Sequence, residues 1–168
     1  MAKINMTKIK ILLVFLLIAT VTFAQKSPRK QASGQVGDVT VSIDYGAPSV
    51  KEREIWGGLE KYGKVWRAGA NENTTIAFDK DVKIGDTAVP AGKYGFFIIP
   101  SENEDWVVIF NKKNDGWGAY SYNEDDDIVR LTIIRKSVDE NQETLDYKVG
   151  EKGIVFAWEK ARLLIPVN

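Results

Sequence analysis

The chain has 168 residues, 23 basic and 23 acidic side chains, and neither histidine nor cysteine. The lack of histidine excludes Ser-His-Asp and Cys-His catalysis and the common zinc and copper sites, and the lack of cysteine excludes disulfides. Any catalysis would use Asp, Glu, Lys, Arg, Tyr, Ser or Thr, and any bound metal would be an oxygen-preferring ion such as calcium. The composition favours a non-catalytic protein, and no residue pattern predicts a cofactor.

The first 24 residues predict a signal peptide. Lys3, Lys8 and Lys10 precede an apolar run of 13 residues, Ile11 to Phe23, and small residues near Ala24 suit signal peptidase. The run is shorter than the about 20 residues of a transmembrane helix, so we expect no membrane span in the mature chain. No cysteine follows for lipid attachment. We therefore expect a soluble protein exported to the periplasm or secreted.

Cleavage after residue 24 would leave 144 residues, with 20 basic and 23 acidic side chains and a net charge of −3. This is the size of one domain. The mild charge gives no electrostatic case for binding nucleic acid or an anionic membrane. Residues 25–35 are polar and predict a flexible leader, and residues 36–168 predict a single domain.

Alternation of apolar and polar residues predicts short strands along the rest of the chain. Their number and spacing favour an all-β fold, an antiparallel sandwich or barrel of nine or ten strands. Ser49 and Glu52 match a capping box, but Gly57 and Gly58 would end such a helix within two turns. Glu159-Lys160 fits either a tight turn or a bulge. The expected strands are 39–45, 74–78, 82–84, 87–89, 94–99, 106–110, 128–134, 144–149, 154–158 and 161–167.

The segment from Tyr45 to Thr75 is too long for a hairpin loop and is rich in glycine, tryptophan and charge. Structureless loops of this length are usually functional or disordered. Its apolar residues allow it to pack against one face or end of the sandwich, which argues against disorder. They are Ile55, Trp56, Leu59, Tyr62, Val65 and Trp66.

Several specific motifs lie in and beyond this segment. They are YGAPSVK at 45–51 with Arg53, IWGGL at 55–59, GKVWRAGANE at 63–72 with Thr74 and Thr75, PAGKY at 90–94, WGAY at 117–120, and WEK at 158–160 with Arg162. With these motifs the chain resembles a family of secreted bacterial proteins catalogued as a domain of unknown function. The resemblance covers nearly the whole mature chain. It implies a single extracytoplasmic β-domain and supplies no activity.

The long segment offers a candidate site for a small anionic or polar ligand. Arginine pairs clamp carboxylate, phosphate or sulfate groups, amide and carboxylate groups bind hydroxyls, and tryptophan, including Trp56, stacks on apolar rings. The alternative is an architectural latch in which Arg67 pairs with Glu72, Asn71 satisfies backbone groups and the tryptophans fill the core. The candidate residues are Lys51, Arg53, Trp66, Arg67, Asn71 and Glu72.

Two other segments are weaker candidates. Asn123 to Asp127 is acidic, but it lacks the spacing of a known calcium loop, so a solvated turn is favoured over a calcium site. Trp117 stands between glycines and fits either an exposed aromatic or a lid on the sandwich. Tyr120 and Tyr122 would point to the same side of an extended segment and form a platform for a sugar.

The three function classes rank as binding protein, structural module and enzyme. An enzyme would be a hydrolase acting on a glycan or ester through Glu72 and a second carboxylate or Lys51. An acid beside Arg67 would have a lowered pKa, which suits a general acid poorly. The sequence does not indicate the oligomeric state.

Overall fold

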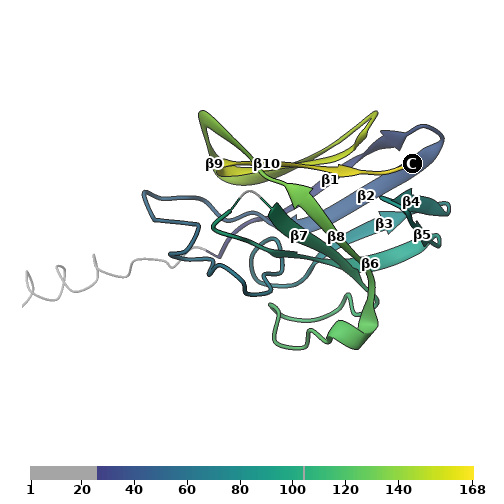
Figure 1. The fold of residues 1–168 in the computed structure, drawn as a ribbon, viewed down its shortest axis with the longest axis horizontal. Helices are drawn as coiled ribbons and strands as arrows, with labels where there is room; N and C mark the ends of the chain where they lie inside the picture. The colour runs from purple at the N-terminus through teal and green to yellow at the C-terminus, as the bar shows by residue number, and fades with distance from the viewer. Residues whose placement is uncertain (1–25, 104) are drawn as a thin grey trace, which may run out of the picture.

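A computed structural model describes residues 26–103 and 105–168 (Figure 1). The expected signal peptide and Gln25 lie outside these residues. The all-β prediction is confirmed, and one short 3₁₀ turn, Glu124–Asp126, stands apart from the strands. In the part of the chain that the structure describes, no helix is long and apolar enough to cross a membrane. The strands are β1 (Arg29–Val36), β2 (Val39–Gly46), β3 (Thr74–Phe78), β4 (Val82–Ile84), β5 (Thr87–Val89), β6 (Gly92–Ile99), β7 (Asp105–Asn111), β8 (Asp127–Ile134), β9 (Lys136–Gly150) and β10 (Gly153–Pro166).

Six strands form one antiparallel sheet in the order β1-β2-β3-β6-β7-β8. β1 and β8 are its two edges, so the sheet is open and does not close into a barrel. The β9–β10 hairpin lies over this sheet as a second layer, and β4 and β5 form a small hairpin near the C-terminus (Figure 1). The architecture is an open sandwich.

β1 differs from the flexible leader expected over 25–35. Its residues RKQASGQV pair with β2 from Arg29 opposite Gly46 to Val36 opposite Val39. Most of its side chains are exposed or half-buried, because an edge strand packs few of them against the core. Arg29 strengthens the pairing, since its Nε lies 2.7 Å from an Asp44 carboxylate oxygen. A polar strand of this kind has no alternation of apolar and polar residues from which the sequence could predict it.

The second layer is a longer hairpin than the sequence predicts. Glu159 lies in an irregularity within β10, where the register with β9 shifts, so the bulge alternative is correct. Its φ of 50° is left-handed. β10 bends back on itself, which brings Gly153 so close to the carbonyl oxygen of Ile165 that a Cβ at this position would clash with it. Only glycine permits this approach.

The core lies between the two layers and is rich in aromatic rings. Tyr45 of β2 packs edge-on against Tyr147 of β9, with ring centroids 4.8 Å apart. Phe96 of β6 packs against Phe110 of β7 at 5.2 Å, and Phe156 of β10 reaches Tyr147 at 5.6 Å. The inward-facing positions of both layers therefore interdigitate, as in other sandwiches.

The segment 47–73 follows β2 and lies at the end of the two layers away from the C-terminus (Figure 1). Isolated bridges fix it to the rest of the fold, pairing Ser49 with Thr144 and Trp66 with Ile98. The expectation that this segment packs rather than remaining disordered agrees with these contacts.

Candidate functional site

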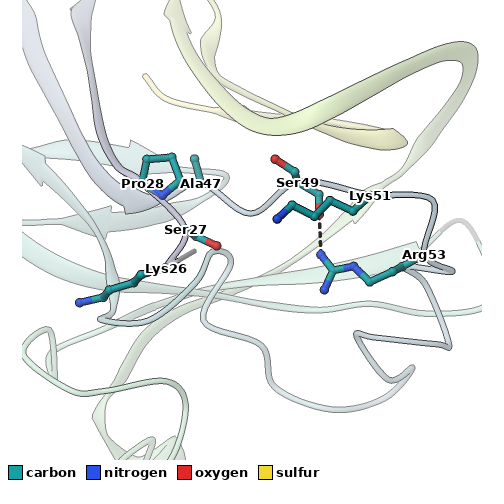
Figure 2. Close-up of a pocket in the computed structure, with 7 residues that line it drawn as sticks. All are labelled: Lys26, Ser27, Pro28, Ala47, Ser49, Lys51 and Arg53. Carbon is teal, nitrogen blue, oxygen red and sulfur yellow. Dashed lines mark hydrogen bonds between the residues drawn. The ribbon is translucent and has the colours of Figure 1, made fainter. Parts of the chain in front are cut away.

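A polar cleft lies where the start of the described chain meets the beginning of segment 47–73 (Figure 2). Its volume is about 360 Å³. Two stretches supply the walls, one before β1 and one after β2, and they are joined because Ala47 N–H donates to the Pro28 carbonyl at 2.8 Å. The cleft therefore continues the β1–β2 ladder beyond the end of the strands. Its lining residues are Lys26, Ser27, Pro28, Ala47, Ser49, Lys51 and Arg53.

A strained turn places the two cations on one wall. Lys51 and Glu52 have φ values of 48° and 56°, and the Arg53 N–H donates to the Val50 carbonyl at 3.1 Å, which closes the turn. Two successive positive φ values are typical of a type I′ turn, which normally uses asparagine and glycine. The capping-box helix considered at Ser49 and Glu52 is therefore not formed. Side chains other than glycine or asparagine pay a steric cost in this region.

Arg53 holds this turn in place. Its Nε donates to the Val50 carbonyl at 3.0 Å and its Nη2 donates to the Ser49 carbonyl at 2.5 Å. The Lys51 N–H donates to the Glu143 carboxylate at 2.9 Å, which ties the turn to β9. The guanidinium is thereby fixed at the cleft without a carboxylate within 4.0 Å among the described residues.

The Lys51 ammonium is uncompensated by any described carboxylate within 4.0 Å. Figure 2 shows the side chains of Lys51 and Arg53 extending toward the same space, which Ser27 borders from the other side. The cleft thus presents a hydroxyl and two cationic groups that make no ion pair within 4.0 Å among the described residues. This arrangement attracts an anion.

Lys26 lies between this cleft and a second one, of about 490 Å³, that Arg29 and Glu72 also line. The Lys26 ammonium pairs with Glu72 at 2.8 Å and lies 5.1 Å from the centre of the Trp117 ring. The hydrogen bond from Lys26 lowers the pKa of Glu72. Glu72 is therefore ionised at neutral pH and does not suit a general acid.

The predicted pairing of Arg67 with Glu72 is wrong. Glu72 pairs with Lys26, and the buried Nε of Arg67 has no hydrogen-bond partner in the described chain. The guanidinium lies against the turn at Gly118, where a Cβ would be 3.4 Å from its Nη1. Asn71 does satisfy backbone groups as the latch proposed, because its amide donates to the Ser27 carbonyl at 3.2 Å.

Glu60 is an acidic neighbour of two candidate site residues, and the sequence does not single it out. Burial raises the pKa of its carboxyl to about 7, although the charges of Arg67 and Arg53 act in the opposite direction. The positive charges of two arginines that the sequence singled out, Arg67 and Arg53, therefore act on Glu60. Nothing in the sequence separates it from the neighbouring acids Glu52 and Glu54, because its burial depends on the path of the whole segment.

Trp66 does not stack on a ligand. It is 4% exposed, and its indole N–H donates to the Gly69 carbonyl at 3.0 Å. Trp56 is half-buried and donates to the Glu159 carboxylate at 3.2 Å. Both rings belong to an aromatic cluster with Trp158 of β10. The core alternative for the tryptophans is correct for Trp66.

The aromatic loop after β7 agrees with the exposed alternative for Trp117 and not with the predicted tyrosine platform. Trp117 is 53% exposed and Tyr120 is 91% exposed, so Trp117 is no lid on the sandwich. Tyr122 is half-buried, donates to Asp127 at 2.6 Å and packs edge-on against Phe97. The platform of Tyr120 and Tyr122 is not formed, because the chain turns at this point and separates the two rings.

The acidic run 123–127 forms the 3₁₀ turn and leads into β8. Asn123 caps the turn, and Asp127 accepts hydrogen bonds from Asn111, Tyr122 and Arg130. No group of three or more acidic side chains suited to a metal ion is found within residues 26–103 and 105–168.

Comparison with known proteins identifies a family for this chain. A search of curated proteins and a search of solved structures found no match. The model of a family described as "Protein of unknown function (DUF2911)" matches residues 27–167. The match spans both cleft walls from Ser27 onward, every strand and the aromatic loop. The chain therefore belongs to the DUF2911 family of proteins of unknown function.

Proposed function

We propose that the protein binds a small anionic ligand in the cleft between Ser27 and Arg53, and that it does so without catalysis. The ligand would carry a carboxylate, phosphate or sulfate group. The observation that carries the proposal is the pair of cations, Lys51 and Arg53, held at one wall with no described carboxylate within 4.0 Å of either charged group. Arg53 supplies a fixed planar donor and Lys51 supplies a mobile one.

The backbone strain at Lys51 supports this proposal. A lysine in the left-handed region costs folding free energy, and strain of this kind is concentrated at functional sites. The turn is braced by Arg53 and by Glu143, so the fold maintains the strained conformation. Packing alone does not account for the strained conformation of Lys51, whereas a ligand-binding role does.

We also propose that the protein acts outside the inner membrane. The support is the sequence pattern of residues 1–24, a basic start and a short apolar run before Ala24. Mass spectrometry of the native protein checks this directly. A chain that begins at Gln25 would agree with export, and a chain that retains Met1 or Ala2 would contradict it.

Isothermal titration calorimetry on the chain beginning at Gln25 tests the binding function. The probes are inorganic phosphate, sulfate and glucuronate, with glucose as a neutral match for glucuronate. We expect at least one anion to bind and glucose to give no heat. Lys51→Gln should weaken binding about tenfold, the effect of losing one charge-assisted contact.

Lys152→Gln is the matched control, because Lys152 is an exposed lysine in the β9–β10 turn and does not line the cleft. Its affinity should equal that of the parent chain. Equal affinities for the Lys51 and Lys152 variants would place anion binding elsewhere. Absence of binding by all three anions would overturn the proposal.

A further inference from the structure

An apolar groove lies along the seam between the two layers, away from the anion cleft. β8 forms one side, the second half of β10 forms the other, and the β4–β5 turn closes one end at Gly85. A Cβ on Gly85 would meet the side chain of Leu131 at 3.2 Å, so this turn packs directly against a residue that lines the groove. The groove volume is about 510 Å³, within the usual range of about 300–1,000 Å³ for small-ligand sites.

The groove exposes apolar side chains that the sandwich leaves uncovered. Ile134 is 63% exposed and Leu164 is 43% exposed, while the neighbouring Leu163 is 2% exposed. Ile134 lies in β8, the edge strand of the sheet, and both leucines lie in β10, and all three line the groove. A joined surface of this kind marks an interaction site more often than scattered exposed residues do.

Two cations are the charged residues that line the groove, and no lining residue is acidic. Lys136 and Arg162 are directly opposite each other in the register of β9 and β10, which places their side chains on the same face. Like charges at opposed positions destabilise a strand pair. A bound anion would offset this repulsion.

Arg162 is held rigidly beside the groove. Its Nη1 donates to the carbonyls of Glu159 and Ala161, each at 3.0 Å, and its Nη2 donates to the Glu140 carbonyl at 2.9 Å. All three acceptors are neutral, so the guanidinium keeps its full positive charge. Lys136 has no carboxylate within 4.0 Å in the described chain.

We propose that this groove binds a single-chain amphiphile with an anionic head, such as a fatty acid. The hydrocarbon tail lies over Leu131, Ile134 and Leu164, and the head group reaches Lys136 and Arg162. The choice of occupant follows from charge complementarity, because a purely apolar ligand would leave the paired cations unneutralised and a cationic one would be repelled. The site is independent of the anion cleft, since the two share no lining residue.

Calorimetric titration with dodecanoate and with dodecyltrimethylammonium, both below their micelle concentrations, tests the proposal. We expect dodecanoate to bind the chain beginning at Gln25 and the cationic amphiphile to bind at least about tenfold more weakly, a difference on the order of one ionic contact. Lys136→Gln should weaken dodecanoate binding by a similar factor. Lys152→Gln should leave it unchanged.

Leu164→Glu should abolish binding, because it places a negative charge among the tail contacts. The matched control is Leu59→Glu, since Leu59 in segment 47–73 is also 43% exposed and does not line the groove. Equal affinity of both leucine variants for dodecanoate, or equal binding of the two amphiphiles, would overturn the proposal. Light scattering covers the remaining alternative. A parent chain that is dimeric, and that Leu164→Glu makes monomeric, would show that a second copy occupies the groove and would also overturn it.

Discussion

The indole rings of Trp66 and Trp158 are stacked, with centroids 5.4 Å apart and an interplanar angle of 22°. Trp66 belongs to segment 47–73 and Trp158 belongs to β10, so this contact joins the proposed ligand-binding segment to the second layer. Trp56 packs edge-on against both rings, at 5.7 and 5.5 Å. The segment is therefore anchored to the second layer by core packing.

Trp158→Ala should reduce the free energy of unfolding by about 3–5 kcal/mol, because it opens a cavity beneath Trp56 and Trp66. Urea denaturation measures the loss. Hydrogen exchange should rise across segment 47–73 as well as in β10. Leu164→Ala is the control at an exposed position of the same strand, and its effect should stay within about 0.5 kcal/mol. A Trp158 variant with unchanged exchange in the segment would contradict the anchoring.

Lys51→Asn should make the protein more stable and a weaker binder. Asparagine tolerates the left-handed region, so relief of strain at a φ of 48° should add about 0.5–1 kcal/mol. Removal of the ammonium should weaken anion binding. Lys51→Gln separates the two effects, because glutamine keeps the strain and loses the charge. If both variants have the stability of the parent chain, the turn at Lys51 is not strained.

Glu72→Ala should leave the thermal midpoint nearly unchanged. Its carboxylate pairs with Lys26 at the surface, where solvent screens the charges and side-chain ordering offsets the attraction. Arg67→Ala and Glu72→Ala should also be additive in a double-mutant cycle, because these two side chains do not pair. A coupling energy between Arg67 and Glu72 outside experimental error would support the latch alternative. Thermal denaturation of the three variants decides the matter.

Glu60→Gln should remove one component of the pH dependence of stability. The pKa of Glu60 is raised from 4.5 to about 7 in the folded protein, so the folded state binds more protons than the unfolded state between these values. Stability therefore falls as pH rises through this window, by up to about 3 kcal/mol. The difference in unfolding free energy between variant and parent should grow from pH 4.5 to pH 7 and then level off. A difference that is constant with pH would contradict the raised pKa.

Much of the fold is predictable because most strands alternate strongly. β2, β3, β7 and β8 each bury one set of side chains or both, and their apolar residues indicate them directly. β1 and the first half of β9 escape detection for the opposite reason. Their sequences, RKQASGQV and KSVDENQE, face solvent, and backbone pairing rather than side-chain burial makes them strands.

The sequence predicts which segment forms the candidate site, but it does not predict which residues pair with one another there. Glycine, tryptophan and charge single out 47–73 because a long connection with such residues must pack or bind. The partner of Glu72 is Lys26, 46 residues earlier in the chain, and the carbonyl that accepts from Asn71 is that of Ser27. The fold brings these residues together, and nothing near Glu72 or Asn71 in the sequence indicates which distant residue becomes the partner. The burial of Glu60 is hidden for the same reason.

The position of Lys26, Ser27 and Pro28 also bears on how the protein is produced for study. These three residues precede the first strand and carry no secondary structure, so a design that trims the chain to begin at Arg29 would keep every strand. It would nevertheless remove one wall from each of the two polar clefts, the carbonyl that meets Ala47 and the partner of Glu72. A preparation shortened in this way would lack residues that form both polar clefts and would retain the apolar groove.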